Sequence, residues 1–229
     1  MRVTQILFSQ GFGTRRVCAG LVANGLVTWQ GRRLHDPQQE LPTAGLVLHV
    51  QGRDWPYRER ALIMLHKPVG YECSQKPRHH ASVMSLLPEP LRQRGVQPIG
   101  RLDEDTTGLL LLTDDGALIH RWTSPKHHVP KVYDIGLRHA PSAAQVAALL
   151  SGVVLDDEPM PVRAAACAAT AERALQLVLT EGKYHQVKRM VAAVGNRVDS
   201  LHRSAFGRLA LPPDLAPGQW RWVDPSEVA

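Results

Sequence analysis

The segment GRLDEDTTGLLLLTDDG, residues 100–116, indicates how the chain folds around its first candidate reactive group. It places Asp103 in a polar stretch just before the apolar run Leu109–Leu112. The run is short, with Gly108 before it and a polar Asp-Asp-Gly sequence after it, which favours a buried strand ending in a turn. Asp103 is therefore expected on a loop anchored by a rigid core element, where catalytic groups are commonly held.

Composition limits the classes of protein that the chain can belong to. Its 229 residues are 44% hydrophobic, which is enough for one large domain or for a large and a small one. The net charge of +6 favours a polyanionic partner, nucleic acid before membrane, with a soluble basic enzyme as the alternative. The three cysteines lie far apart without a CxxC pair, which argues against a disulfide framework and a zinc ribbon. No signal-like or membrane-length apolar run occurs, so we expect a cytoplasmic protein.

Residues 1–54 have the pattern of a small ααβ module. Apolar residues recur at helical spacing within 3–7 and again within 17–22. Short strands are expected at 26–29 and 46–50. The order of these segments predicts two helices followed by a small sheet.

This module is also basic. It holds six arginines against three acidic residues, so its net charge is +3, half of the total. Arg15 and Arg16 stand at the start of the second predicted helix, after Thr14 as a candidate N-cap. They predict a face that binds the RNA backbone, and an ordinary solvated charged face is the alternative.

A polar stretch, GRDWPYRER at 52–60, contains a proline and predicts a linker. We place the linker at 55–60, between an N-terminal domain at 1–54 and a larger domain at 61–229. Strands and helices then alternate, which predicts an α/β or α+β fold without a dinucleotide-binding phosphate loop. The strands are expected at 61–65, 109–112, 131–137 and 175–180, and the helices at 142–150 and 187–194.

Lys188 is a candidate partner for a carboxylate. It lies in EGKYHQVKRM, where Val187, Met190 and Val191 mark one apolar helix face. Lys188 follows Val187 directly, so it falls at the margin of that face, from which its ammonium can reach a cleft over the core. There it would lower the pKa of a carboxylate and keep it ionised. A surface lysine whose stem covers apolar neighbours is the commoner alternative.

Tyr133 is a candidate for stacking on a base. The strand KVYDIGL places Lys131, Tyr133 and Ile135 on one face. A tyrosine facing a cleft can hold an unstacked nucleotide, whereas a tyrosine with a satisfied hydroxyl in the core is the alternative.

Other polar clusters predict no chemistry of their own. Asp103 and Asp105 stand two residues apart on one loop, which is an unusual way to straddle a sugar, so Asp105 is expected to serve the loop alone. Asp114–Gly116 is expected to form a simple turn. The adjacent pairs His79–His80 and His127–His128 lack the spacing of a helical zinc site, so no metal is expected.

Five motifs in this order resemble the pseudouridine synthases, in particular the branch that acts on bacterial ribosomal RNA and carries an S4-like N-terminal domain. They span about 140 residues and are HKPVG (66–70), GRLDEDTTGLLLLTDDG (100–116), KVY (131–133), EGKYHQVKRM (181–190) and LHRSAFG (201–207). The sequences DTTGL, LTDDG and HRWTSPKHH are most similar to the enzymes of the small subunit. The sequence Thr14-Arg15-Arg16 departs from the family's usual Ser-Arg.

The resemblance implies an α+β fold: a catalytic domain with a mixed, mainly antiparallel sheet and flanking helices, plus a small S4-like RNA-binding domain. It implies that Asp103 is the essential aspartate, that Tyr133 packs on the target base and that Lys188 is the charge partner of Asp103. It implies further RNA contacts from Arg101, which would fill the gap left by the flipped nucleotide, and from Leu201, which would line the base pocket. The remaining expected RNA-contacting residues are Lys131, His185, Arg15 and Arg16.

The implied reaction converts a uridine of 16S ribosomal RNA, at the 516 site, into pseudouridine. It requires no cofactor, because bond cleavage, base rotation and rejoining need no donor or redox change. The expected partner is ribosomal RNA, free or within an assembling small subunit, and the protein is expected to be a monomer. A target in 23S RNA, a non-catalytic RNA-binding protein of ribosome assembly and a histidine-based metal hydrolase are the alternatives, the last disfavoured by the histidine spacing.

Overall fold

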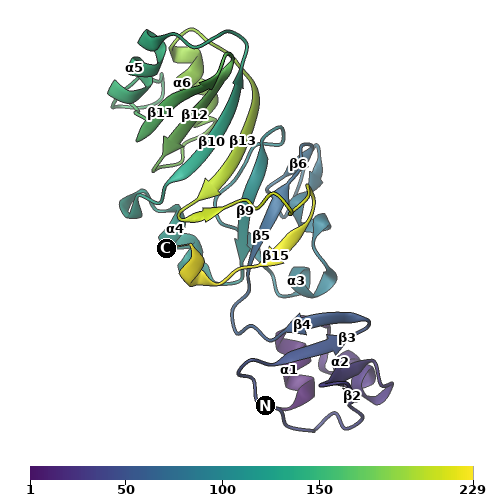
Figure 1. Ribbon diagram of the computed structural model, residues 1–229. Coiled ribbons are helices and arrows are strands. Elements are labelled where there is room, and N and C mark those ends of the chain that lie inside the picture. Colours follow the sequence, from purple (N-terminus) through teal and green to yellow (C-terminus); the bar gives the residue numbers. More distant parts are fainter. Residues whose placement is uncertain (229) are drawn as a thin grey trace. The chain divides into compact units, whose positions relative to one another are not determined.

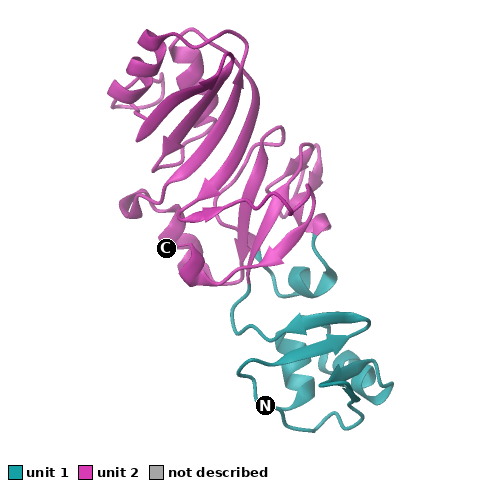
Figure 2. Cartoon of the chain, viewed as in Figure 1, with its two compact units in different colours: residues 1–61, 87–96 teal, residues 62–86, 97–229 magenta. Residues whose placement is uncertain are grey.

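The computed structural model describes residues 1–228, which form two compact units (Figure 2). The first unit comprises residues 1–61 together with 87–96, and the second comprises 62–86 and the chain from 97 onward. The segment 87–96 thus belongs to the first unit, although residues 62–86 separate it from that unit in sequence. The predicted division into 1–54, 55–60 and 61–229 does not include this segment in the N-terminal domain. No helix within residues 1–228 has the length and apolarity needed to cross a membrane.

The first unit has three helices and a four-stranded sheet in the order β2-β1-β3-β4 (Figure 1). Its helices are α1 (Val3–Ser9), α2 (Arg15–Ala23) and α3 (Glu89–Gln93), and its strands are β1 (Val27–Trp29), β2 (Arg32–Arg33), β3 (Val47–Val50) and β4 (Arg53–Pro56). Both predicted helices and both predicted strands are confirmed. The predicted linker is wrong at Trp55 and Pro56, which pair with β3 as part of β4.

Local chemistry explains these elements. Val3, Ile6 and Leu7 bury one face of α1 completely, as their spacing predicted. Thr14 caps α2 by accepting a hydrogen bond from the Val17 amide at 3.3 Å. Trp55 pairs with Leu48 in the sheet, is only 7% exposed and packs edge-on against Phe12. This packing explains why the residue lies in a strand and not in a linker.

The second unit is built on a nine-stranded sheet in the order β11-β12-β10-β13-β9-β5-β15, with β14 on β13 and β8 on β9. Its strands are β5 (Leu62–Lys67), β8 (Gln97–Pro98), β9 (Thr107–Thr113), β10 (Lys131–Leu137), β11 (Ala166–Ala171), β12 (Ala174–Leu179), β13 (Val198–Phe206), β14 (Leu209–Ala210) and β15 (Trp220–Trp222). The pairs are antiparallel except β13 with β9, so the sheet is mixed and mainly antiparallel, as expected.

Helices and a small ribbon flank this sheet. They are α4 (Gly116–Thr123), α5 (Ala143–Ser151), α6 (Gln186–Ala193) and the parallel ribbon of β6 (Tyr71–Glu72) and β7 (Ala81–Ser82), with short 3₁₀ turns at Val83–Leu86, Pro125–His127 and Pro225–Glu227. Figure 1 shows α5 and α6 beside the strands β11, β12, β10 and β13. The predicted helices at 142–150 and 187–194 are confirmed as α5 and α6.

Several elements depart from the sequence-based expectations, among them α4, β11 and β13. Asp114–Gly116 is more than a turn, because the Asp115 carboxylate caps α4 by accepting from the amides of Ala117 and Leu118. The strand β13, in the middle of the sheet, and the alanine-rich strand β11 were not expected. Their compositions explain why: β13 is rich in polar residues and alanine has low strand propensity.

The parallel junction of β9 with β13 positions the loop that carries Asp103. It pairs Thr107 with His202 and Gly108 with Arg203. Gly108 has φ of +110°, and a side chain there would collide with the backbone of Arg203. Glycine therefore permits the close approach of the two strands. Strand β9 is buried almost throughout, so the loop before it starts from a rigid support.

Candidate active site

The loop before β9 is held by backbone contacts on both sides of Asp103. The Thr106 amide donates to the Asp103 carbonyl at 3.1 Å, which closes a turn. Leu102 is buried and its amide donates to the Cys73 sulfur at 3.4 Å. The Asp103 side chain nevertheless remains 30% exposed. The carboxylate is thus fixed at its base and accessible at its tip.

Lys67, the last residue of β5, clamps the same loop from inside. Its side chain is fully buried, and its ammonium donates to the carbonyl oxygens of Pro68 (3.1 Å), Glu104 (3.1 Å) and Thr106 (2.8 Å). Burial lowers the pKa of Lys67, although neighbouring acidic groups oppose this shift. Lys67 was not among the predicted site residues. One signal in the sequence could have indicated its role: Lys67 is a charged residue at the end of a largely apolar strand, within the motif HKPVG.

Two basic side chains from the start of α6 reach Asp103. Lys188 Nζ lies 3.3 Å from Asp103 Oδ2, and His185 Nε2 lies 3.4 Å from Asp103 Oδ1. His185 precedes the first residue of α6 in a left-handed backbone conformation, with φ of 45°. Such a conformation is uncommon for a residue other than glycine and is often found at functional sites. The helix start therefore places one basic group on each oxygen of the carboxylate.

Asp105 is a closer partner of Lys188 than Asp103 is, so the expectation that it serves only the loop is wrong. Lys188 Nζ donates to both Asp105 oxygens, at 2.6 and 2.9 Å. Partial burial lowers the pKa of Lys188, but the hydrogen bond to Asp105 and the charges of both aspartates outweigh it and raise the pKa. Burial likewise raises the pKa of Asp105, but Lys188 outweighs it and lowers the pKa. Lys188 is therefore a shared ammonium between two carboxylates.

Tyr133 and Leu201 lie on neighbouring strands of the sheet, on one face. The register pairs Tyr133 with Arg203 and Ile135 with Leu201, and Arg203 in turn pairs with Gly108 of β9. Tyr133 is 9% exposed and Leu201 is 7% exposed. Both side chains therefore lie on the same face of the sheet, near the strand that follows the Asp103 loop.

Comparison with known proteins places this geometry in a family. Residues 61–193 match the family model described as RNA pseudouridylate synthase. A ribosomal small subunit pseudouridine synthase A of Yersinia pestis is 45% identical over 72% of this chain and 70% of that protein. The chain belongs to the RNA pseudouridine synthases.

Two full-length matches extend the similarity to the whole synthase. An uncharacterized RNA pseudouridine synthase of Bacillus subtilis is 38% identical and covers 100% of this chain and 97% of that protein. A crystal structure of a pseudouridylate synthase is 32% identical with a TM-score of 0.70, covering 100% of this chain and 98% of that one. The synthase is therefore an isomerase, and both of its units have counterparts in these relatives.

Lys131, an expected RNA contact, is largely enclosed by the protein. It is 9% exposed, and its ammonium donates to the Val129 carbonyl at 2.9 Å, 5.4 Å from the Phe206 ring centroid. Burial, with a smaller contribution from the charge of Arg203, lowers the pKa of Lys131 to about 8. These contacts hold the Lys131 ammonium beside Val129 and Phe206, and its expected contact with RNA stays a prediction.

The remaining predicted residues are on the surface. Arg101 is exposed on the loop, two residues before Asp103. Arg15 and Arg16 are exposed in the first turn of α2, in the first unit. Within residues 1–228, no three His, Cys, Asp or Glu side chains gather in a way that would hold a metal ion.

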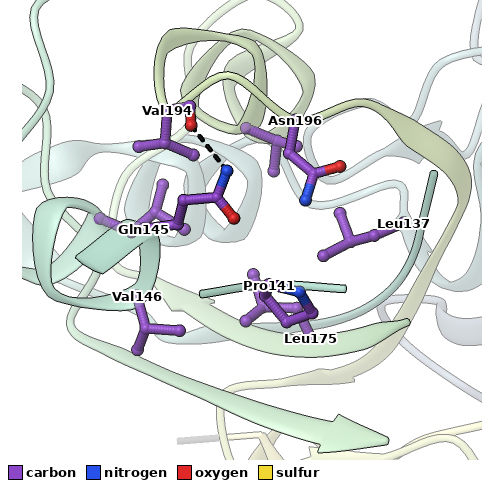
Figure 3. A pocket seen from close by; sticks show the side chains of 9 residues that line it. Leu137, Pro141, Gln145, Val146, Leu175, Val194 and Asn196 are labelled. Carbon is purple, nitrogen blue, oxygen red and sulfur yellow. Dashed lines mark hydrogen bonds between the residues drawn. The ribbon is translucent and has the colours of Figure 1, made fainter. Parts of the chain in front are cut away.

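A small apolar crevice between α5, α6 and the sheet is separate from this constellation (Figure 3). It contains none of the predicted site residues, and Gln145 spans it by donating to the Val194 carbonyl at 2.8 Å. Its lining is that of a packing defect between two helices: Leu137, Pro141, Gln145, Val146, Leu149, Leu175, Val191, Val194 and Asn196.

Proposed function

We propose that this synthase converts a uridine of 16S ribosomal RNA, the 516 site, into pseudouridine, with Asp103 as the reactive carboxylate. The observation that carries the proposal is the setting of Asp103, which is partly exposed, rooted in a clamped loop and flanked by Lys188 and His185. An accessible carboxylate held in this way can act as a nucleophile.

The chemistry is an internal exchange of bonds. The bond from uracil N1 to ribose C1′ breaks, the base turns, and C5 bonds to C1′. The C5 proton leaves to solvent and N1 gains a proton, so atoms balance without a donor or an oxidant. Asp103 would hold the severed fragment covalently or assist its formation, which divides one difficult step into easier ones. Lys188 and His185 would hold the Asp103 carboxylate in position through their contacts with its two oxygens.

The base must leave the RNA stack before Asp103 can reach it. Flipping costs a few kcal/mol, which contacts in an enclosed pocket offset. Tyr133 and Leu201 would supply stacking and apolar contact to the flipped uracil, and Arg101 would occupy the gap that the base leaves in the RNA. Their place on one face of the sheet, next to the strand that follows the Asp103 loop, supports these roles.

The first unit would act as the S4-like domain that anchors the RNA. Arg15 and Arg16 stand in the first turn of α2, at the positive end of the helix dipole, which favours anions. Phosphate contacts there would supply salt-dependent affinity without base specificity.

The names of the relatives support a small-subunit target. Relatives at 45% identity in Yersinia pestis and 36% in Vibrio parahaemolyticus are named for the ribosomal small subunit. Carbodiimide modification followed by primer extension, on ribosomal RNA from cells with and without the gene, tests the target. We expect a stop in 16S RNA to disappear with the gene. A stop lost from 23S RNA instead would overturn the 16S assignment.

The role of Asp103 is tested by Asp103→Asn. We expect release of tritium from C5-labelled uridine in transcribed 16S RNA to stop, while affinity for the RNA stays within about 3-fold, since an uncharged amide keeps the shape of the side chain. Glu104→Gln is the matched control, because it removes a neighbouring carboxylate whose side chain faces His80 instead. Turnover by Asp103→Asn at a rate near that of the control would reject Asp103 as the reactive group.

A further inference from the structure

Tyr184 presents an open aromatic face next to the reactive carboxylate. Tyr184 is 70% exposed, which is unusual for so large a ring. The ring stacks on the His185 imidazole with centroids 3.9 Å apart and planes inclined by 17°. His185 in turn lies 3.4 Å from Asp103. The three side chains therefore form a series from the carboxylate out to solvent, ending in the free face of Tyr184.

The backbone that carries this ring is held in place. Arg189 donates to the Tyr184 carbonyl at 3.0 Å and also pairs with Asp157. The preceding residue, Lys183, pairs with Glu158 at 2.6 Å. The backbone beneath the exposed ring is thus held by contacts at Tyr184 and at Lys183, so the ring does not belong to a loosely held loop. A fixed aromatic face loses little conformational entropy when a ligand stacks on it.

We propose that the outer face of Tyr184 stacks on an unpaired nucleobase next to the target uridine in the RNA. An aromatic face stacks on any of the four bases, and such contacts are common in the recognition of single-stranded RNA. His185 separates Tyr184 from Asp103, so a base on Tyr184 belongs to a neighbouring nucleotide rather than to the one that reacts.

This inference rests on the proposed role of Asp103 only for its location beside the reacting nucleotide. The competing explanation is that Tyr184 merely supports the ring of His185. The two differ in what they predict. A stacking platform contributes to RNA affinity, whereas a support for His185 contributes to turnover and to its pH dependence.

The test compares Tyr184→Phe and Tyr184→Leu with the native protein, all checked by thermal melting. Binding of transcribed 16S RNA is measured across a salt series, and kcat and KM are measured by tritium release. We expect Tyr184→Phe to behave as the native protein. Tyr184→Leu should raise Kd and KM by between about 5-fold and 150-fold, the range for loss of one stacked base. The slope of log Kd against log salt should not change, because a neutral ring releases no counterions.

Val154→Ala is the matched control, since Val154 is 73% exposed and packs near the other end of α6. Its binding should equal that of the native protein. Native affinity in Tyr184→Leu would overturn the proposal, and so would a fall in kcat with a shifted pH profile and unchanged Kd. Binding needs no turnover, so this result stands apart from the Asp103→Asn experiment. If Asp103→Asn were active, Asp103 would not be the reactive carboxylate. The effect of Tyr184→Leu on Kd would still show whether Tyr184 contacts the RNA.

Discussion

Two helices of this protein, α2 and α6, begin with basic side chains, and they differ in what those charges meet. The start of a helix is the positive end of its dipole, so a basic residue there is unfavourable. In α6, Lys188 is paired with Asp105 at 2.6 Å and with Asp103 at 3.3 Å. In α2, Arg15 and Arg16 stand in a first turn that contains no acidic residue.

The positive charges at the two helix starts therefore serve two purposes, one within the protein and one toward an external ligand. At α6 the charge is compensated within the protein, so its effect is local: it positions Asp103 and Asp105 and lowers the pKa of Asp105. At α2 the charge is left for solvent or for an external anion, with Arg15 lying over the Phe8 ring at 5.5 Å. A compensated charge organises chemistry, whereas an uncompensated one at a helix start attracts a polyanion. The predictions below test this contrast.

The largest effect is expected at α6, from Lys188→Met. Loss of the shared ammonium leaves Asp103 and Asp105 without their common partner, so kcat should fall by at least about 100-fold. The salt dependence of RNA binding should change little, because this charge is already neutralised in the free protein. Lys188→Arg keeps the charge and should recover part of the activity. Equal loss in both variants would show that the charge of Lys188 is not what matters.

A smaller effect, of another kind, is expected at α2. The double variant Arg15→Gln with Arg16→Gln should weaken RNA binding by roughly 10-fold and lower the salt slope by about 1.4, with kcat at saturation unchanged. Arg138→Gln is the control, because Asp199 already binds the Arg138 guanidinium through both of its oxygens. A salt slope in the double variant equal to that of the control would mean that α2 does not contact phosphates.

Asp105→Asn tests how much Asp105 contributes to the raised pKa of Lys188. The pKa of Lys188 is raised by Asp103 and Asp105 together, so removing one anion lowers it. The alkaline limb of the kcat profile, where Lys188 loses its proton, should therefore move to lower pH. At neutral pH we expect a fall in kcat of about 3- to 10-fold, well below the effect of Lys188→Met. If the alkaline limb of the variant stayed at the native pH, Asp105 would not contribute to the pKa of Lys188.

The smallest effect is on stability. Arg16→Glu places an acidic residue in the first turn of α2, which should stabilise the helix by about 0.5–1 kcal/mol through the dipole while weakening RNA binding. Hydrogen exchange of the α2 amides in the full-length protein measures the stabilisation, and exchange in α6 serves as the internal reference. Faster exchange in α2 would show that Arg16 makes stabilising contacts that outweigh the dipole.

Much of the fold followed from local patterns, because each pattern needs only its neighbours to form. The alternation in KVYDIGL predicted β10 over the same residues that the structure gives, and the apolar spacing after Val187 predicted α6. Strand β13 was missed because its polar residues conceal the alternation, although it occupies the middle of the sheet. Helix α4 was missed because Asp-Asp-Gly is equally typical of a turn and of a helix start.

What the sequence by itself determined is the family, through ordered motifs, and the setting of Asp103 on a loop before a buried strand. Tertiary structure alone decided that Asp105 shares Lys188, a contact between residues 83 positions apart, and that Lys67 turns inward to bind the loop carbonyls. A charged residue looks the same in sequence whether it faces water or a partner. Its partner is chosen by strand register and by the point where distant elements meet, here the junction of β9 with β13, which no local pattern encodes.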